Sequence, residues 1–102
     1  MRTANIYVNN TLAGELIEYE KNNFKFRYLD EYSGSAISLT MPITQTEYIF
    51  KSFPPYFDGL LPEGIQLEAL LKAQKIDRDD SFSQLLAVGK DLVGTLTVKE
   101  KT

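Results

Sequence analysis

The chain has 102 residues, of which 43% are hydrophobic and 25% are charged, proportions typical of one globular domain. It contains no His and no Cys, which excludes Ser-His-Asp triads, Cys nucleophiles, redox cysteine pairs and zinc sites of the usual nitrogen and sulfur type. The formal net charge is −3, and the 11 Lys and Arg residues are spread along the chain rather than clustered. Direct binding to DNA or RNA is therefore disfavoured, because it depends on neutralising phosphates.

The sequence also lacks the features of an exported or membrane protein. The N-terminus has no apolar signal segment, and no apolar run approaches the roughly 18 residues that span a bilayer. The absence of Cys is compatible with a reducing compartment. We expect a soluble cytoplasmic protein that does not contact membranes.

The first part of the chain has the pattern of a β-hairpin. We expect strands over residues 4–8 and 12–19, joined by a turn at Asn9-Asn10, because Asn tolerates the positive φ of a tight turn. Gly14 lies inside the second run. A glycine there predicts a bulge or a close approach of another backbone.

Two further strands are expected before the middle of the chain. Aromatic residues alternate with cations over residues 24–29, the period of a half-buried strand. A fourth strand is expected over residues 36–40, ended by Pro42. Residues 44–51 are compatible with a short strand or a turn.

Helices are expected in the second half. Two consecutive prolines make residues 53–57 unsuitable for a regular strand or a helix interior. Pro62 lacks an N–H and Glu63 suits the positive end of the helix dipole, so a helix is predicted from Pro62 to about Lys75.

A second helix and a closing strand follow. Ser81 is a candidate cap for a helix over residues 82–88 that ends at Gly89, and residues 92–98 return as a strand. The pattern predicts one α+β domain over residues 1–102, with a small antiparallel sheet or partly closed barrel and two to four short helices. The side chains expected to be largely buried are Phe26, Tyr28, Leu39, Phe57, Leu61, Leu70, Phe82, Leu85, Leu86 and Val93.

Acidic residues in loops are the candidates for chemistry. Asp58 before Gly59 could hold Mg²⁺ near a phosphate, but no phosphate-binding loop accompanies it, and a loop turn is the favoured interpretation. Asp77, Asp79 and Asp80 lack the central Gly and bidentate Glu of a calcium loop, so a solvated turn is favoured there. We expect no catalytic residue, no metal site and no cofactor.

Gly64 is unusual because it falls in the first turn of the predicted helix. Glycine costs a helix up to about 1 kcal/mol relative to Ala. The sequence therefore predicts that something packs closely against Gly64, either this chain's own backbone or a partner.

Two sequence blocks carry a resemblance to a known family. Residues 57–64 read Phe-Asp-Gly-Leu-Leu-Pro-Glu-Gly, and residues 82–96 read Phe-Ser-Gln-Leu-Leu-Ala-Val-Gly-Lys-Asp-Leu-Val-Gly-Thr-Leu. In this order and spacing they resemble the small N-terminal domain of HipA-type serine/threonine kinase toxins. The Gly14-Glu15-Leu16 hairpin and residues 38–42 also resemble it, so the resemblance covers essentially the whole chain. The sequence departs from the family pattern at Gly59, where Asn is frequent, and at Thr95, where Ala is frequent.

The resemblance implies a function in binding. The sequence ends at Thr102, where a HipA kinase would continue into its catalytic core. It is similar in this to HipS-like antitoxins of tripartite HipBST systems, whose separate HipT kinase lacks the segment. The resemblance implies a non-catalytic antitoxin that binds and inhibits a HipT-like kinase in trans, and leaves open whether a HipB-like DNA-binding protein contacts this chain in a ternary complex. The alternative is the N-terminal regulatory domain of a HipA kinase, acting in cis.

The expected kinase-facing element is the segment over residues 53–66, because it combines a proline-stiffened loop, a helix N-terminus and a glycine. Ile65 is the candidate apolar anchor, and the alternative is that it extends the apolar face of its helix toward Ala69. The predicted partner-binding residues are Phe57, Asp58, Gly59, Glu63, Gly64, Ile65 and Gln66.

Overall fold

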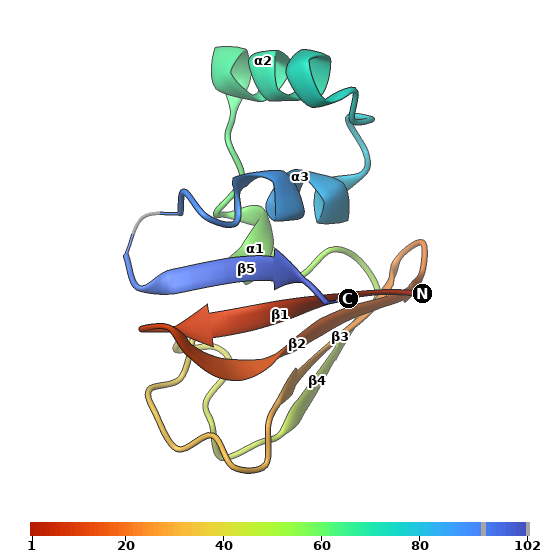
Figure 1. Ribbon diagram of the computed structural model, residues 1–102. Helices are drawn as coiled ribbons and strands as arrows, with labels where there is room; N and C mark the ends of the chain where they lie inside the picture. Colours follow the sequence, from red (N-terminus) through yellow and green to blue (C-terminus); the bar gives the residue numbers. More distant parts are fainter. Residues whose placement is uncertain (93, 102) are drawn as a thin grey trace.

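The fold is an open antiparallel sheet with helices on one face (Figure 1). The computed structural model describes residues 1–92 and 94–101. In these residues the elements are β1 (Arg2–Val8), β2 (Thr11–Glu20), β3 (Asn23–Tyr28), β4 (Glu47–Phe50), α1 (Pro55–Asp58), α2 (Gly64–Gln74), α3 (Ser81–Val88) and β5 (Leu96–Glu100). The strand order is β4-β3-β2-β1-β5 and every neighbouring pair is antiparallel, with β4 and β5 at the two edges. The predicted α+β class is confirmed in its open-sheet form.

The first hairpin forms as its sequence predicts. Asn9 and Asn10 both have positive φ, 51° and 66°, and connect β1 to β2. Gly14 pairs with Ile6, and the register then shifts between Ile6 and Tyr7, which marks a bulge. A Cβ on Gly14 would also lie 2.4 Å from the carbonyl oxygen of Arg27. Both expectations for this glycine, a bulge and a close backbone approach, are confirmed.

The strand predicted over residues 36–40 is wrong. Instead of a strand, the described structure has a single bridge between Ser38 and Met41 at this point. The buried hydroxyl of Tyr28 organises the segment, since it accepts from the N–H of Ile37 at 3.0 Å and donates to the carbonyl of Met41 at 2.6 Å. Leu39 lies at the turn and is fully exposed. The fourth strand is β4, which lies within the ambiguous region 44–51.

The core lies between one face of the sheet and the segments that cover it. Of the ten residues expected inside, Phe26, Tyr28, Phe57, Phe82 and Leu85 are buried, Leu61, Leu70 and Leu86 are half-buried, Leu39 is exposed, and Val93 lies outside the described residues. Leu85, rather than Leu86, is the leucine of α3 that the core encloses completely. The prediction for Leu39 failed because it assumed a strand.

Three element boundaries differ from expectation. Helix α2 starts at Gly64 rather than Pro62, because Glu63 is extended at φ −129°. Helix α3 is capped by Asp80 rather than Ser81, since the Asp80 carboxylate accepts from the N–H of Ser83. The last strand starts at Leu96, not at residue 92.

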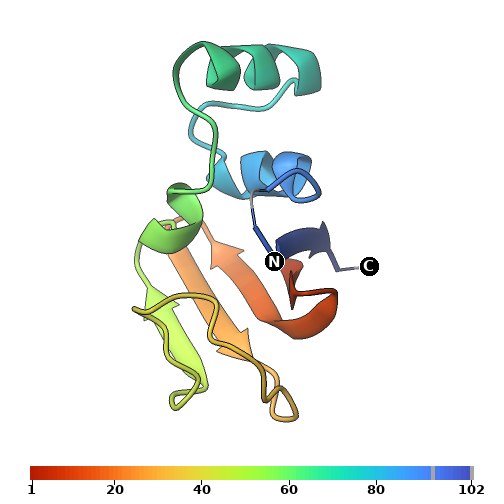
Figure 2. The ribbon, with the colours of Figure 1, turned by 90° about the vertical axis from the view of Figure 1, so that its left-hand side faces the viewer.

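The helices form two levels above the sheet. Helix α3 lies close to the sheet, and α2 lies beyond α3 (Figures 1 and 2). The end of α3 is held tightly: Val98 donates its N–H to the carbonyl of Gly89 at 3.0 Å, and a Cβ on Gly89 would lie 2.0 Å from the carbonyl oxygen of Val98. Position 89 therefore needs glycine for close packing.

Candidate protein-binding surface

Helix α1 fixes the start of the predicted kinase-facing segment. Pro54 is buried at its N-cap and Pro55 is its first residue, a position where a missing N–H costs no helical bond. The Phe57 ring packs against the rings of Phe26 and Tyr56, with centroids 6.0 and 5.2 Å away. Phe57 is fully buried in this structure, so it anchors the segment to the core.

The polar part of the same segment is open to solvent. Asp58 and Gly59, at the end of α1, are exposed, and so are Glu63, Gly64 and Gln66. The structure therefore brings most of the predicted partner-binding residues to the surface while it places Phe57 beneath them.

Gly64 is explained by backbone conformation. Its φ is +59°, in the left-handed region that favours glycine, and it joins the extended Glu63 to the first turn of α2. Among the described residues, nothing lies within 4 Å of a Cβ built at this position. The prediction that this chain's own backbone packs against Gly64 is wrong, whereas contact with a partner stays a prediction.

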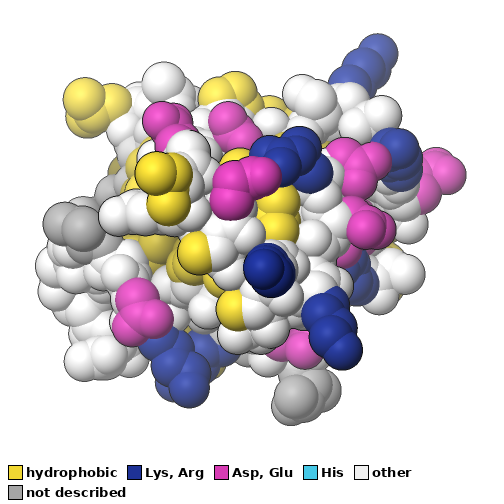
Figure 3. All heavy atoms as spheres, turned by 90° about the horizontal axis from the view of Figure 1, so that it is seen from above, with side chains coloured by type: hydrophobic (Ala, Val, Ile, Leu, Met, Phe, Trp, Pro, Cys, Tyr) yellow, Lys and Arg dark blue, Asp and Glu magenta, His cyan; other side chains and the backbone are white. Residues whose placement is uncertain are grey.

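Helix α2 is weakly attached to the rest of the chain. None of its residues is buried, and its leucines, among them Leu67 and Leu70, are only half-buried. Ile65 in its first turn is 87% exposed, so it is not a core residue of the free chain. Seen from the α2 end, hydrophobic side chains lie open between acidic and basic ones (Figure 3). Ile65 and the half-buried leucines are therefore the apolar side chains that α2 offers to a partner.

One ion pair connects α2 to the loop that follows it. Arg78 donates to the carboxylate of Glu68, and this bond lowers the pKa of Glu68 and raises that of Arg78. Both side chains are more than half exposed, so the pair contributes little to stability. The position of α2 thus depends on few strong contacts.

A shallow groove of about 380 Å³ runs between the α1–α2 connection and the end of α3. Its lining includes Gly59 and Gln66, two predicted partner-binding residues that the fold brings to one site. The remaining lining residues are mostly apolar: Leu60, Leu61, Pro62, Val88, Asp91 and Leu92. The groove can therefore accept apolar side chains of a partner, and Gln66 at its margin directly follows the exposed Ile65 in α2.

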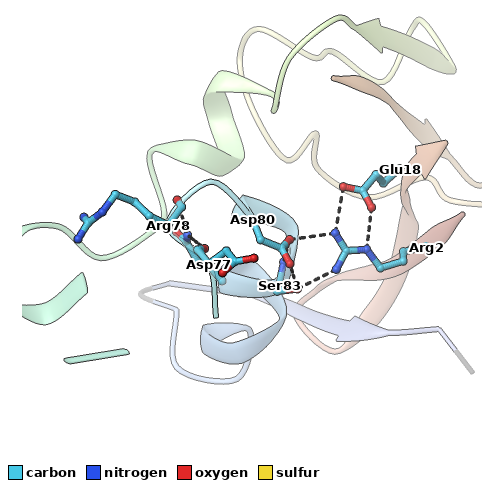
Figure 4. Close-up of polar contacts among 7 residues, drawn as sticks. Arg2, Glu18, Asp77, Arg78, Asp80 and Ser83 are labelled. Atoms are coloured by element: carbon cyan, nitrogen blue, oxygen red, sulfur yellow. Dashed lines mark hydrogen bonds and ion pairs between the residues drawn. The ribbon is translucent and has the colours of Figure 1, made fainter. Parts of the chain in front are cut away.

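A partly buried network of polar side chains joins β1 and β2 to the start of α3 (Figure 4). Arg2 of β1 donates to both carboxylate oxygens of Glu18 at 2.7 and 3.0 Å, to Asp80 at 2.9 Å and to the hydroxyl of Ser83 at 2.7 Å. The bond to Glu18 is the main reason that the pKa of Arg2 is raised. Burial raises the pKa of Asp80, but hydrogen bonds from Arg2 and Ser83 outweigh it and lower the pKa overall. The network holds α3 on the sheet.

The acidic loop before α3 is structural in this fold. Asp80 caps the helix, and the Gln84 side-chain amide donates to the carbonyls of Asp77 and Arg78 at 3.2 and 2.9 Å. Within residues 1–92 and 94–101, no three His, Cys, Asp or Glu side chains are grouped so that they could hold a metal ion. The favoured interpretation of this stretch as an ordinary turn between helices agrees with its geometry.

Sequence reasoning missed the Arg2 network and two exposed apolar residues. The pairing of Arg2 with Glu18 could have been found by extending the hairpin register from Asn9-Asn10 with a one-residue shift for the bulge at Gly14, because without that shift Arg2 would lie opposite Ile17. Leu39 and Ile49 have no comparable local signal. They are exposed at 100% and 73%.

Residues 4–99 match the family model described as the HipA N-terminal domain. The chain belongs to this family. The match covers nearly every element of the sheet and all three described helices, so it includes the groove and the residues around Gly64.

Two individual proteins are similar to this HipA N-terminal domain. An uncharacterized protein of Haemophilus influenzae (strain ATCC 51907 / DSM 11121 / KW20 / Rd) is 30% identical over 101 residues, which are 99% of this chain and 94% of the relative. A solved structure of the N-terminal domain of HipA toxin has a TM-score of 0.79 at 28% identity, and the match covers 100% of this chain and 94% of that one. Family membership supports a toxin–antitoxin context with a kinase as a possible kind of partner. In the described part of the chain, no helix is both long and apolar enough to cross a membrane.

Proposed function

We propose that this chain is a HipS-like antitoxin that binds a HipT-like serine/threonine kinase toxin in trans and inhibits it. The observation that carries the proposal is the state of α2: a helix without a buried residue that presents Ile65 at 87% exposure. An exposed apolar side chain on a defined helical turn suits insertion into a pocket of another protein. In this proposal the chain acts in the cytoplasm, has no catalytic activity and needs no cofactor.

The rigidity of the segment before α2 supports inhibition by binding. Pro54 and Pro55 restrict the backbone, and the buried ring of Phe57 fixes α1 to the core. A surface that is ordered before binding loses less conformational entropy when the complex forms. Asp58 and Glu63 add negative charge to this surface, which favours a basic region of the kinase as the contact.

The second candidate is the same domain acting in cis. The similar solved structure is an N-terminal domain of HipA toxin, and the match covers 94% of it. In that case the same surface would pack against a kinase core in its own polypeptide. Gene context distinguishes the two, because the antitoxin reading requires a separate neighbouring kinase that lacks this domain.

The decisive experiment adds the purified chain to the purified neighbouring kinase and follows transfer of labelled phosphate. We expect loss of phosphorylation at about one chain per kinase, without a DNA-binding protein present. Co-expression of the chain should also restore growth to cells that express the kinase. Full kinase activity at a several-fold excess of the chain would refute the proposal.

Inclusion of a HipB-like protein tests the ternary complex. If this third protein contacts the chain, it should increase retention of the chain on immobilised kinase. Equal retention with and without it would show that any DNA-binding subunit is held by the kinase alone.

A further inference from the structure

The edge strand β4 has main-chain groups available for pairing. It is the last strand of the sheet and pairs with β3 on one side only (Figure 2). The N–H of Tyr28 bonds to the carbonyl of Thr46 at 2.9 Å, so the even-numbered residues direct their polar backbone groups toward β3. Glu47 and Ile49 therefore direct theirs toward the open edge.

The open edge is also apolar at its centre. Ile49 is 73% exposed, and Glu47 beside it is exposed too. Within the described residues, the Gln45 amide donates to the carbonyl of Glu47 at 2.7 Å, and no bond is found to the backbone of Ile49. An exposed strand edge with an apolar side chain is a template for another strand.

The charges on the solvent-facing side of the sheet alternate toward this edge. Glu15 of β2 lies opposite Arg27 of β3, which lies opposite Glu47 of β4. Arg27 contacts Glu15 at 2.8 Å. The row ends on the Glu47 carboxylate at the edge, which Lys25 of β3 approaches from one side at 3.4 Å. A cation on the next strand would approach it from the open side.

We propose that a second copy of this chain pairs with β4 in an antiparallel arrangement about a two-fold axis. In the register that places Ile49 opposite Ile49 of the second copy, Glu47 lies opposite Lys51 of that copy, and the reverse pair forms by symmetry. Lys51 is exposed directly after β4. The charge row then continues as Glu15, Arg27, Glu47 and the second copy's Lys51, with alternating sign across both molecules.

Other registers fit less well. A one-residue slip would turn each side chain to the opposite face, so only shifts that preserve the face are possible. One such register places Glu47 opposite Glu47 of the second copy, and another places Ile49 opposite Lys51. The first opposes like charges and the second loses the apolar contact, so the Ile49 register is favoured.

The association should be weak and reversible. β4 has only four residues, and the Gln45 amide must leave the Glu47 carbonyl before a new strand can bond there. We therefore expect a dimer dissociation constant between about 10 µM and about 1 mM. The proposed surface is separate from Ile65 and the groove, so it does not depend on kinase inhibition.

Sedimentation equilibrium of the purified chain over this concentration range tests the proposal. We expect a monomer–dimer equilibrium, and Lys51→Glu should weaken it by about tenfold because two attractive pairs become repulsive. The double variant Glu47→Lys/Lys51→Glu restores opposite charges across the interface and should recover most of the affinity. Failure of the double variant to recover affinity would refute the proposed register.

Ile49→Pro tests the strand edge itself. The Ile49 N–H points away from β3, so the substitution removes no bond of the β3–β4 ladder and should leave the circular dichroism spectrum unchanged. We expect a monomer at every concentration. Leu39→Lys is the control, because it removes a fully exposed leucine that lies outside β4 and should leave the dimer intact. A monomeric wild-type chain at about 1 mM, or an Ile49→Pro variant that still dimerises, overturns the proposal.

Discussion

Arg2 and Asp80 form an ion pair at 2.9 Å, although 78 positions separate them in the sequence. Arg2 lies in the first strand and Asp80 at the N-cap of α3, so this contact joins the start of the sheet to the helix that covers it. The same carboxylate accepts from the N–H of Ser83 at 3.1 Å. One side chain thus caps a helix and fixes its position.

Asp80→Ala should lower the free energy of unfolding by about 1–2 kcal/mol, because it removes a cap and one partner of a partly exposed ion pair. Urea denaturation followed by circular dichroism measures the change. Asp79→Ala is the matched control: its side chain is 75% exposed, 3.6 Å from Lys21, and should change stability by less than about 0.5 kcal/mol. Equal effects of the two substitutions would show that neither the cap nor the ion pair with Arg2 stabilises the domain.

Gly89→Ala should destabilise the domain by about 3 kcal/mol or more. The added methyl group would meet the backbone of Val98 at 2.0 Å, and a strand backbone cannot move away as a flexible side chain can. Gly59→Ala is the control, since its φ is −66° and the nearest atoms to a Cβ are 3.5 Å away. Thermal unfolding should show a large fall in Tm for the first variant and little change for the second. A Gly89→Ala protein with a normal Tm would mean that β5 and α3 are not in close contact.

Stability should fall as the solution becomes more acidic than about pH 4.5, partly because of Glu15. The bond from Lys101 is the main cause that lowers the pKa of Glu15 below its ordinary 4.5; burial opposes it, and Arg27 adds to the lowering. The unfolded chain then binds a proton more readily than the folded chain. Stability from this group is therefore complete above the ordinary pKa and is lost as the pH falls through the folded-state pKa.

Glu15→Gln isolates this contribution. The variant should be less stable than the wild type at pH 7, and the difference should shrink as the pH is lowered from 5 toward 2, about the range over which a paired carboxylate titrates. Urea denaturation at several pH values gives the comparison. A difference that is the same at every pH would show that Glu15 acts through packing rather than charge.

Ile65→Asp should leave the fold intact and abolish inhibition of the kinase. The side chain is 87% exposed, so a carboxylate there costs little in the free chain, whereas it would be buried without a partner in an apolar kinase pocket. The readouts are Tm for folding and phosphate transfer for inhibition. Leu39→Asp changes a leucine that is equally open but distant, and should retain inhibition. A folded Ile65→Asp variant that still inhibits would move the inhibitory contact to another surface.

Reversing both Asp58 and Glu63 to Lys should weaken kinase binding by about tenfold and leave Tm nearly unchanged, because both residues are exposed. Most of the effect should be in the association rate and should decrease with added salt. Reversal of Glu31 and Glu100, two exposed acids elsewhere, is the matched control for net charge. If the control weakens binding equally, overall charge rather than this surface is responsible. A loss of fold in the first variant would show that the two residues are structural.

Part of the candidate surface could be predicted from the sequence. Consecutive prolines and the helix that follows them are local features, and the structure has both, although α2 begins at Gly64 rather than Pro62 and Glu63 is extended. Which of the apolar residues in this segment are buried could not be predicted from the sequence. Phe57 and Ile65 are both apolar residues near a helix start, yet one is fully buried and the other is 87% exposed. The difference depends on which helix lies against the sheet.

The sequence by itself determined the elements whose cause is local. Asn at positive φ makes the β1–β2 turn, alternation of aromatic and charged residues makes β3, and Gly89 ends α3. These outcomes follow from interactions between residues a few positions apart, which a sequence displays directly.

The tertiary structure decided the outcomes that depend on distant partners. Residues 37–41 form a loop because the Tyr28 hydroxyl is close enough to bond to both ends of it. Asp80 rather than Ser81 caps α3, where Arg2 pairs with the same carboxylate. Helix α2 is left without a buried side chain because α3 already occupies the face of the sheet. Each result depends on which side chains the folded chain brings together, and that choice is made by packing across the whole domain.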